Sequence, residues 1–271
     1  GDLQANGVGL GQTGTLDVNG HAILQAGTGG LAIHNARVGA LTAIGASITQ
    51  TGTASVGSRA DLVTGGDITL VDFNAGLLDA DAAAITQTGT LTVTGVAKLD
   101  SPGAIALANV TAGALDVTTG NQLQIAGGTI TGRAGLSAAT SMTLSNLGAG
   151  SIIAAAAALG VSGLTVGTDA TLTSRAAALS LGNVSVGGDL QANGVGLGQT
   201  GTLDVDGHAT LQAGTGGLAI HNARAGGLTA TGASITQTGT ASVAGRAELD
   251  TSGDIALVDF NAGMLDADAA A

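Results

Sequence analysis

Apolar and polar residues alternate along most of the chain in short segments. Leu16 and Val18, for example, flank a polar residue and precede the turn-forming pair Asn19-Gly20. Alternation with a period of two predicts half-buried β-strands, here three to seven residues long, and clusters such as residues 64–66 predict turns between them. No helical stripe is sustained beyond the Ala-rich stretch at 154–158. The pattern therefore predicts a chain of short strands in which helix is a minor component.

The chain repeats itself on two scales. Residues 1–84 align without gaps to 188–271, with 12 differences in 84 positions. A shorter period lies inside this long repeat, because the tetrapeptide Gln-Thr-Gly-Thr recurs with spacings of 38, 37, 112 and 38 residues. It begins at Gln12, Gln50, Gln87, Gln199 and Gln237. These spacings indicate a unit of 37 to 38 residues, and each unit splits into two strand-bearing halves of about 19 residues.

Short strands at a period near 19 residues could form a propeller, a sandwich or a parallel β-helix. A propeller carries aromatic blade signatures that are absent here, and a sandwich gives no reason for so strict a period. In a parallel β-helix, each coil contributes short strands that align with their counterparts one coil on. We therefore predict an all-β fold, a right-handed parallel β-helix (solenoid) of about 19 residues per coil and roughly 14 coils, as a single repeat segment over residues 1–271.

Composition indicates a narrow interior filled by small aliphatic side chains. Gly occupies 48 positions, 44% of residues are hydrophobic, and the chain has two Phe but no Trp or Tyr. A globular core built from large aromatic side chains is therefore excluded, while the hydrophobic content is too high for a disordered chain. Glycine also supplies the positive φ angles that the corners of a coil require.

Charge and targeting signals narrow the possible partners. The formal net charge is −12, and the seven basic residues are scattered singly, which argues against nucleic acid or anionic lipid as a partner. The chain has no cysteine, which excludes disulfides and thiol chemistry. The longest apolar run, 151–164, is too short and too often interrupted by Gly and Ser to span a bilayer. Because residues 1–3 recur at 188–190 and no signal peptide opens the chain, we expect a fragment of a larger protein.

Several phrases of the repeat resemble a known family. Gly-Thr-Leu-Asp-Val-Asn-Gly-His-Ala (14–22) and Gly-Asp-Ile-Thr-Leu (66–70), in Gly-rich and aromatic-poor repeats, resemble the repeat region of filamentous haemagglutinin and closely similar two-partner-secreted adhesins of Gram-negative bacteria. The resemblance covers essentially the whole chain. The family's amino-terminal secretion domain has no match, and the nearest string to its Arg-Gly-Asp tripeptide is Arg59-Ala-Asp61.

The resemblance implies a secreted, surface-displayed shaft. It implies export through an outer-membrane two-partner secretion transporter, and contact with host cell-surface receptors or glycans through the full-length protein. We therefore expect the structural shaft of a secreted filamentous adhesin that mediates bacterial attachment to host cells. One alternative is the shaft of a contact-dependent growth inhibition exoprotein, which a carboxy-terminal toxin domain would distinguish. An alternative from another class is a polysaccharide-processing β-helix enzyme.

The histidines and aspartates that could form a chemical site are expected to lie on the solvated surface. The four histidines are two positions seen twice, His21 with His208 and His34 with His221. Thirteen residues part His21 from His34, so the imidazoles need not converge on a metal or a substrate. Carboxylates that could ligate calcium recur in strand-like segments, but the calcium-binding nonapeptide of β-rolls is absent. They are Asp72, Asp79 and Asp81, with Asp266 and Asp268 in the second copy.

Catalysis is not expected from this residue inventory. Lys98 is the sole lysine and Glu248 the sole glutamate, whereas carbohydrate-active β-helices assemble carboxylates with Lys or Arg beside aromatic platforms. No nucleophile elbow is present. The Thr-Gly-Thr tripeptides recur too rarely for an ice-binding lattice and are read as strand entries. We predict no enzyme activity, no cofactor, no metal, no catalytic residue and no membrane insertion, and nominate no binding residue.

Overall fold

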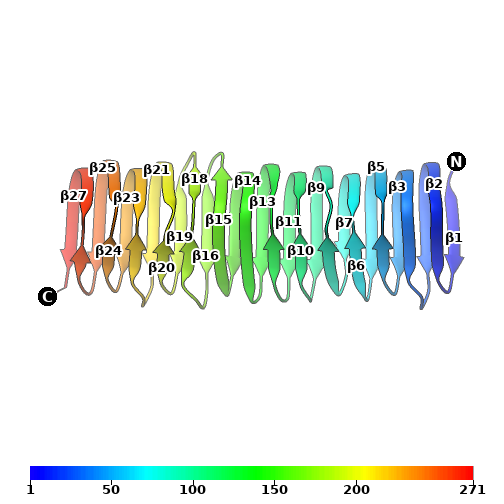
Figure 1. Ribbon diagram of the computed structural model, residues 1–271, viewed down its shortest axis with the longest axis horizontal. Helices are drawn as coiled ribbons and strands as arrows, with labels where there is room; N and C mark the ends of the chain where they lie inside the picture. The colour runs from blue at the N-terminus through cyan, green and yellow to red at the C-terminus, as the bar shows by residue number, and fades with distance from the viewer. Residues whose placement is uncertain (271) are drawn as a thin grey trace. The chain divides into compact units, whose positions relative to one another are not determined.

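The protein is built from β-strands alone. The computed structural model describes residues 1–270, which contain 27 strands and no helix (Figure 1). The chain divides into two compact units, Gly1–Ala139 and Thr140–Ala271. Within each unit the strand pairs are parallel. No helix long and apolar enough to cross a membrane occurs among the described residues.

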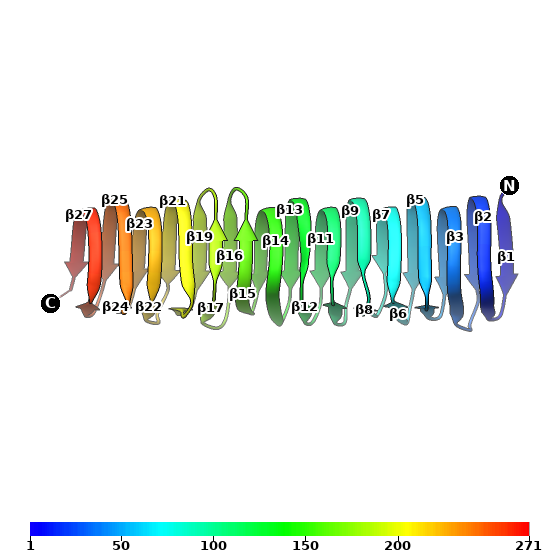
Figure 2. The same cartoon turned by 45° about the horizontal axis from the view of Figure 1, so that its top comes forward.

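The first unit contains 13 strands, and from β3 onward long strands alternate with short ones. They are β1 (Leu3–Gly7), β2 (Leu10–Ala26), β3 (Leu31–Gly45), β4 (Ile48–Gln50), β5 (Thr53–Thr64), β6 (Asp67–Leu70), β7 (Asp72–Asp81), β8 (Ala84–Gln87), β9 (Leu91–Ser101), β10 (Ile105–Leu107), β11 (Val110–Thr119), β12 (Leu123–Ile125) and β13 (Gly128–Ala138). In Figure 2 the short strands β6, β8 and β12 lie along one side of this unit, away from the labelled tops of β7, β9 and β13.

The second unit contains 14 strands among the described residues, and short and long strands alternate in it only from β20 onward. They are β14 (Ser141–Ala156), β15 (Ala158–Val166), β16 (Ala170–Ser174), β17 (Leu179–Leu181), β18 (Val184–Val186), β19 (Leu190–Gly194), β20 (Leu197–Gln199), β21 (Thr202–Ala213), β22 (Leu218–Ile220), β23 (Asn222–Gly232), β24 (Ile235–Gln237), β25 (Thr240–Thr251), β26 (Ile255–Ala256) and β27 (Asp259–Ala269). The Ala-rich stretch at 154–158 is strand, since β14 ends at Ala156 and β15 begins at Ala158.

Strand registers define three sides of each coil. On the first side, Leu3 pairs in register with Ala22 and Ala22 with Leu41. The second side starts with the pair Leu10 and Leu31, and the third side with Leu16 and Ala36. The predicted parallel β-helix is confirmed as a β-solenoid of about 14 turns of ~19 residues.

Predicted strand lengths were too short in places. β2 runs for 17 residues through Asn19-Gly20, which were predicted to form a turn. The corner between the third and first sides is only a register shift between Val18 and His21. The backbone therefore bends there without leaving the strand, because neighbouring coils keep their hydrogen bonds on either side of the shift.

Large and small side chains form a checkerboard inside the first side. In the first unit the stacked row reads Leu3, Ala22, Leu41, Ala60, Leu78, Ala97, Leu115 and Ala134. Two residues further along each strand the order is reversed, as Ala5, Leu24, Ala43, Leu62, Ala80, Leu99, Val117 and Leu136. The second unit shows the same reversal from Ile152 and Ala154 onward.

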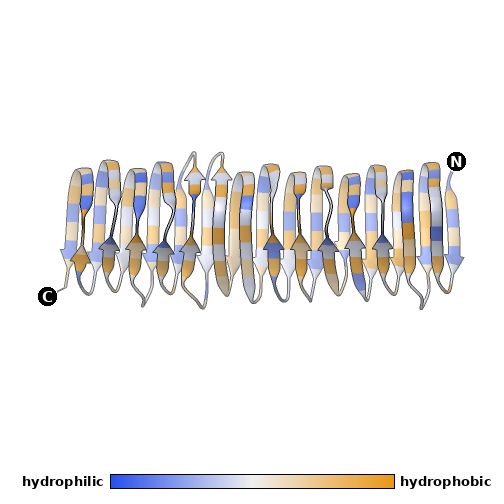
Figure 3. Cartoon of the chain, in the orientation of Figure 1, coloured by the Kyte–Doolittle hydropathy of each residue, from blue (hydrophilic) through white to orange (hydrophobic). Residues whose placement is uncertain are grey.

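The checkerboard gives the double-coil period a physical origin. A leucine in one coil lies against an alanine in the next at most positions of these rows, with Val117 between Leu99 and Leu136 as the exception, so large and small side chains offset one another between coils. Leu41, Ala43, Ala60 and Leu62 are at most 1% exposed. The alternation of apolar and polar residues along the strands is visible in Figure 3. A coil is therefore complementary to its neighbour rather than to a copy of itself.

Candidate functional site

Buried glutamines mark one corner of alternate coils in two parts of the chain. Gln50, Gln87, Gln199 and Gln237 are at most 2% exposed. The Gln50 side chain donates from Nε2 to the Gly52 carbonyl at 3.0 Å and accepts at Oε1 from the Val71 backbone N–H, one coil on, at 2.9 Å. The buried amide is thus satisfied at both ends, as burial requires.

Corner length separates the two kinds of coil. After Gln12, Gln50, Gln87, Gln199 and Gln237, three residues precede the next inward side chain; after an aliphatic residue at the same position, only two do. We call these long and short corners. Around Gln50 and Gln87 and around Gln199 and Gln237, each long corner is followed by a short one, so the 37 to 38-residue unit there is one coil of each class. Between Gln87 and Gln199 five short corners follow one another, at Leu107, Ile125, Leu144, Val161 and Leu181.

A second side chain ties each long corner to the coil before it. The Asn35 Oδ1 accepts a hydrogen bond from the Thr53 backbone N–H at 2.9 Å, and Asn222 does the same for Thr240 at 3.0 Å. Gly52 has φ +73° and lies against Asn35, so a Cβ there would collide with the Asn35 side chain. Thr53 and Thr240 begin β5 and β25.

The tetrapeptide Gln-Thr-Gly-Thr is therefore a structural corner motif. Sequence reasoning found its recurrence but missed that its glutamine is buried, because isolated glutamine is normally a surface residue. The one signal for burial was its fixed spacing of two after an inward aliphatic residue, as in Ile48 and Gln50.

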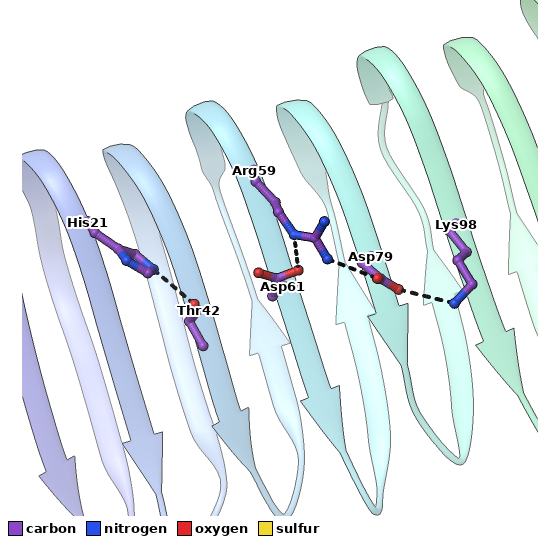
Figure 4. Close-up of polar contacts among 6 residues, drawn as sticks. All are labelled: His21, Thr42, Arg59, Asp61, Asp79 and Lys98. Carbon is purple, nitrogen blue, oxygen red and sulfur yellow. Dashed lines mark hydrogen bonds and ion pairs between the residues drawn. The ribbon is translucent and has the colours of Figure 1, made fainter.

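Ion pairs follow the outside of the first side in the first unit (Figure 4). Arg59 contacts Asp61 of its own strand at 2.5 Å and Asp79 of the next coil at 3.0 Å. Lys98 approaches Asp79 from the following coil at 3.9 Å. The hydrogen bond to Asp61, with the attraction between the charges, raises the pKa of Arg59 above its usual value. The arrangement links three successive coils.

Ion pairs also occur in the second unit. Arg246 lies 2.8 Å from Asp266 and 3.7 Å from Glu248, as Arg59 does in the first copy. Arg224 contacts Asp204 at 2.6 Å and Asp206 at 3.3 Å. The hydrogen bond to Asp204 is the main reason that the pKa of Arg224 is raised. All of these groups lie in solvent, where such pairs contribute modestly.

The four histidines are dispersed over the surface. His21 and Thr42 lie 2.9 Å apart through Nε2 and Oγ1 (Figure 4), and the His21 backbone N–H donates to Asp2 at 2.9 Å. His208 repeats both contacts, with Thr229 and Asp189. His34 and His221 instead lie beside Thr51 and Thr238. Each imidazole thus contacts a threonine of the following coil, and the structure does not bring His21 to His34.

The carboxylates singled out for calcium are spread along the unit. Asp79 is held by Arg59 and Lys98, Asp81 pairs in register with Asp100, and the Asp72 Oδ1 accepts from the Thr90 backbone N–H at 2.9 Å. Among residues 1–270, no group of three or more His, Asp or Glu side chains is placed to hold a metal ion.

These observations define a repeat protein of the parallel β-solenoid class, whose recurrent polar groups connect one coil to the next. The family described as "Repeats of unknown function (DUF5649)" matches residues 71–111, 167–224 and 217–262, just over half of the chain. The chain belongs to this repeat family. No curated protein and no solved structure matches it.

Proposed function

We propose that this chain is a shaft segment of a secreted filamentous adhesin of a Gram-negative bacterium, and that it has no enzymatic activity. The observation that carries the proposal is that the recurrent side chains contact neighbouring coils of the same chain. Inward residues fill the spaces between coils, and the recurrent polar groups, such as Gln50 and Asn35, hydrogen-bond to the adjoining coil. A sequence repeated in this way extends a stack of coils and adds length.

The exposed charged groups support a structural role. Arg59, Asp79 and Lys98 connect successive coils, and Arg246 does so in the second copy. A catalytic group needs a partner that orients it toward a reacting atom. Here the partners are the carboxylates and amides of neighbouring coils, so their geometry serves stacking.

The surroundings of such a shaft follow from the resemblance noted in the sequence. We propose export through an outer-membrane two-partner secretion transporter, display at the bacterial surface or release, and contact with host receptors or glycans by other parts of the full-length protein. The net charge of −12 supports solubility outside the cell and disfavours nucleic acid as a partner.

The test compares the isolated chain with the full-length protein. Host epithelial cells and a glycan array are incubated with each at matched concentration, together with a full-length variant that lacks residues 60–96, which form two coils. We expect the full-length protein and its shortened variant to bind and the isolated chain not to bind. Saturable binding by the isolated chain would make this segment itself adhesive, and cleavage of a polysaccharide by it would contradict the proposal.

A further inference from the structure

Two exposed apolar side chains lie next to each other on the outside of the first side in the first unit. Ile44 and Val63 are 39% and 45% exposed and pair in register on neighbouring coils. In the second copy the equivalent positions hold Thr231 and Asp250. Single exposed apolar residues are ordinary on a protein surface, whereas neighbouring ones indicate a contact surface.

The fold does not require this apolar pair. Inward residues beside it are Ala43 and Leu62 in the first copy and Ala230 and Leu249 in the second, and all four are at most 1% exposed. The packing beneath the pair therefore uses the same residue types in both copies, whereas the outward surface is apolar in one and polar in the other. We infer that the apolar pair serves a contact outside the chain.

We propose that the outward face of the first side, over residues 3–100, is a contact surface between two molecules of this chain, which pack face to face with their coils in opposite order. Ile44 of each molecule then lies against the partner's Val63, about a twofold axis that runs parallel to the strands. This contact removes both apolar side chains from water. The inference concerns the association of solenoids and does not depend on the adhesin role.

Polar residues of the same row match when the order of the coils is reversed. Gln25 and Asp81 flank the apolar pair, one coil before it and one coil after it, so Gln25 lies opposite the partner's Asp81. One coil further out, Asn6 lies opposite the partner's Asp100. A side-chain amide donates hydrogen bonds and a carboxylate accepts them. The two flanks of the apolar pair therefore complement each other.

The carboxylates of this row favour the reversed order over the same order. With coils in the same order, contact of Ile44 with the partner's Ile44 would place Asp81 on the partner's Asp81 and Asp100 on the partner's Asp100. Like charges that face each other oppose association. In the reversed order, these carboxylates lie at least three coils apart, which is about 14 Å.

The neighbouring row of side chains is compatible with the same arrangement. Asp61 lies opposite the partner's Thr42. Asp79, which pairs with Arg59 at 3.0 Å, lies opposite the partner's Ile23. Among residues 3–100, no charged side chain of this face lies opposite one of the same sign.

The size of the surface predicts a weak dimer. Six coils contribute to it, and at ~4.8 Å per coil and ~16 Å of strand they bury roughly 900 Å² over the two molecules. This area lies at the lower end of specific interfaces. The net charge of −12 per molecule opposes association, and salt screens that repulsion. We therefore expect a reversible dimer that becomes more stable as salt is raised.

Cross-linking tests the order of the coils, because the chain has no cysteine of its own. Molecules carrying Gln25→Cys are mixed with molecules carrying Asp81→Cys and treated with a short bis-maleimide. We expect the mixed product to form at least about tenfold faster than the product of either variant with itself, since identical positions lie about 14 Å apart along the stack. Faster linkage of Gln25→Cys to itself than to Asp81→Cys would overturn the reversed order.

Sedimentation equilibrium tests whether the apolar pair holds the dimer together. A variant with Ile44→Thr and Val63→Asp carries the residues of the second copy, which form the same kind of strands. The matched control is Ile153→Thr, which changes a residue of the second unit that is 46% exposed. We expect the association constant of the parent chain to rise with salt, that of the double variant to fall by about tenfold or more, and that of the control to stay within about twofold.

Three results of the sedimentation experiment would overturn the proposal. The first is a parent chain that stays monomeric at about 1 mM. The second is equal association of the parent and the double variant. The third is association that weakens as salt is raised, which would indicate binding through ion pairs instead of the apolar pair.

Discussion

The corners at Val161 and Gln199 are stacked two coils apart in the second unit, yet they solve the same hydrogen-bonding problem differently. Val161 pairs in register with Leu181, and Leu181 with Gln199. At the short corner, the Gly182 N–H of the next coil donates to the Val161 backbone carbonyl at 2.7 Å. At the long corner, the equivalent His221 N–H donates to the Gln199 side chain at 2.6 Å.

The difference indicates that the glutamine side chain serves as a hydrogen-bond acceptor at the long corner. At Gln50, Gln199 and Gln237 the side-chain amide receives the N–H of the next coil, whereas at Gln87 the backbone carbonyl and the side chain both accept it. A buried N–H without an acceptor costs about 1–3 kcal/mol. A glutamine that folds back from the same position supplies the missing acceptor. Short corners need no such side chain, which is why Ile125 and Val161 occupy this position without a polar partner.

The largest expected effect comes from placing one long corner directly on another. Removing residues 60–77 deletes one coil and places Leu78 on Leu41, with the Gln87 corner directly on the Gln50 corner. We expect a loss of about 2–4 kcal/mol from overpacking, voids and unpaired amides. Removing residues 60–96 deletes two coils and keeps the order.

Thermal unfolding followed by circular dichroism distinguishes these deletions. The longer deletion should melt near the parent temperature, although it leaves a shorter chain. If the single-coil deletion melts at the same temperature as the two-coil deletion, coil class has no energetic meaning.

A glycine substitution tests the clearance at the long corner. Gly201→Ala would bring a methyl group 2.7 Å from the Gly182 carbonyl carbon, beside the Asn183 side chain. We expect a loss of about 2 kcal/mol or more in the free energy of unfolding, measured with urea. Gly198→Ala is the matched control three residues away, because nothing lies within 4 Å of its Cβ. Similar losses for both would show that the contact with Asn183 is not decisive.

Two variants test the role of Gln199: one removes its side chain, and the other also shortens the corner so that no side-chain acceptor is needed. Gln199→Val should cost about 1–2 kcal/mol, because the His221 N–H loses its acceptor in a partly buried site. Replacing residues 199–202 with Val-Ser-Gly, the sequence of the short corner at 161–163, should recover most of that loss. Urea unfolding of both variants measures the difference. Failure of the shortened corner to recover stability would separate glutamine from corner length.

The smallest effect concerns an ion pair that differs between the copies. Arg224 contacts Asp204 and Asp206. Arg37 pairs in register with Asp17, has Asn19 in the place of Asp206, and makes no ion pair among the described residues. Arg224→Gln should lower the melting temperature slightly at low salt and less at about 1 M salt, where charges are screened. Arg37→Gln should leave it unchanged. A salt-independent loss in Arg224→Gln would point to packing of its aliphatic stem.

Much of the fold could be predicted from particular residues. The alternation at Leu16 and Val18 correctly predicted strands, and the fixed spacing of Gln-Thr-Gly-Thr predicted coils of the correct length. The buried position of Gln50 could not be predicted. One partner of its side chain, the Val71 N–H, lies 21 positions further along the chain. The other, the Gly52 carbonyl, belongs to a corner whose path the sequence does not define.

The sequence by itself determined the solenoid, since period-two alternation and a strict repeat leave few other ways to bury small aliphatic side chains. Only the tertiary structure decided that the coils fall into two complementary classes. Whether Leu41 lies on Ala60 or on another leucine depends on inter-coil register. That register is fixed jointly by the checkerboard, the corner lengths and the hydrogen bonds between coils, none of which is local to one segment of the chain.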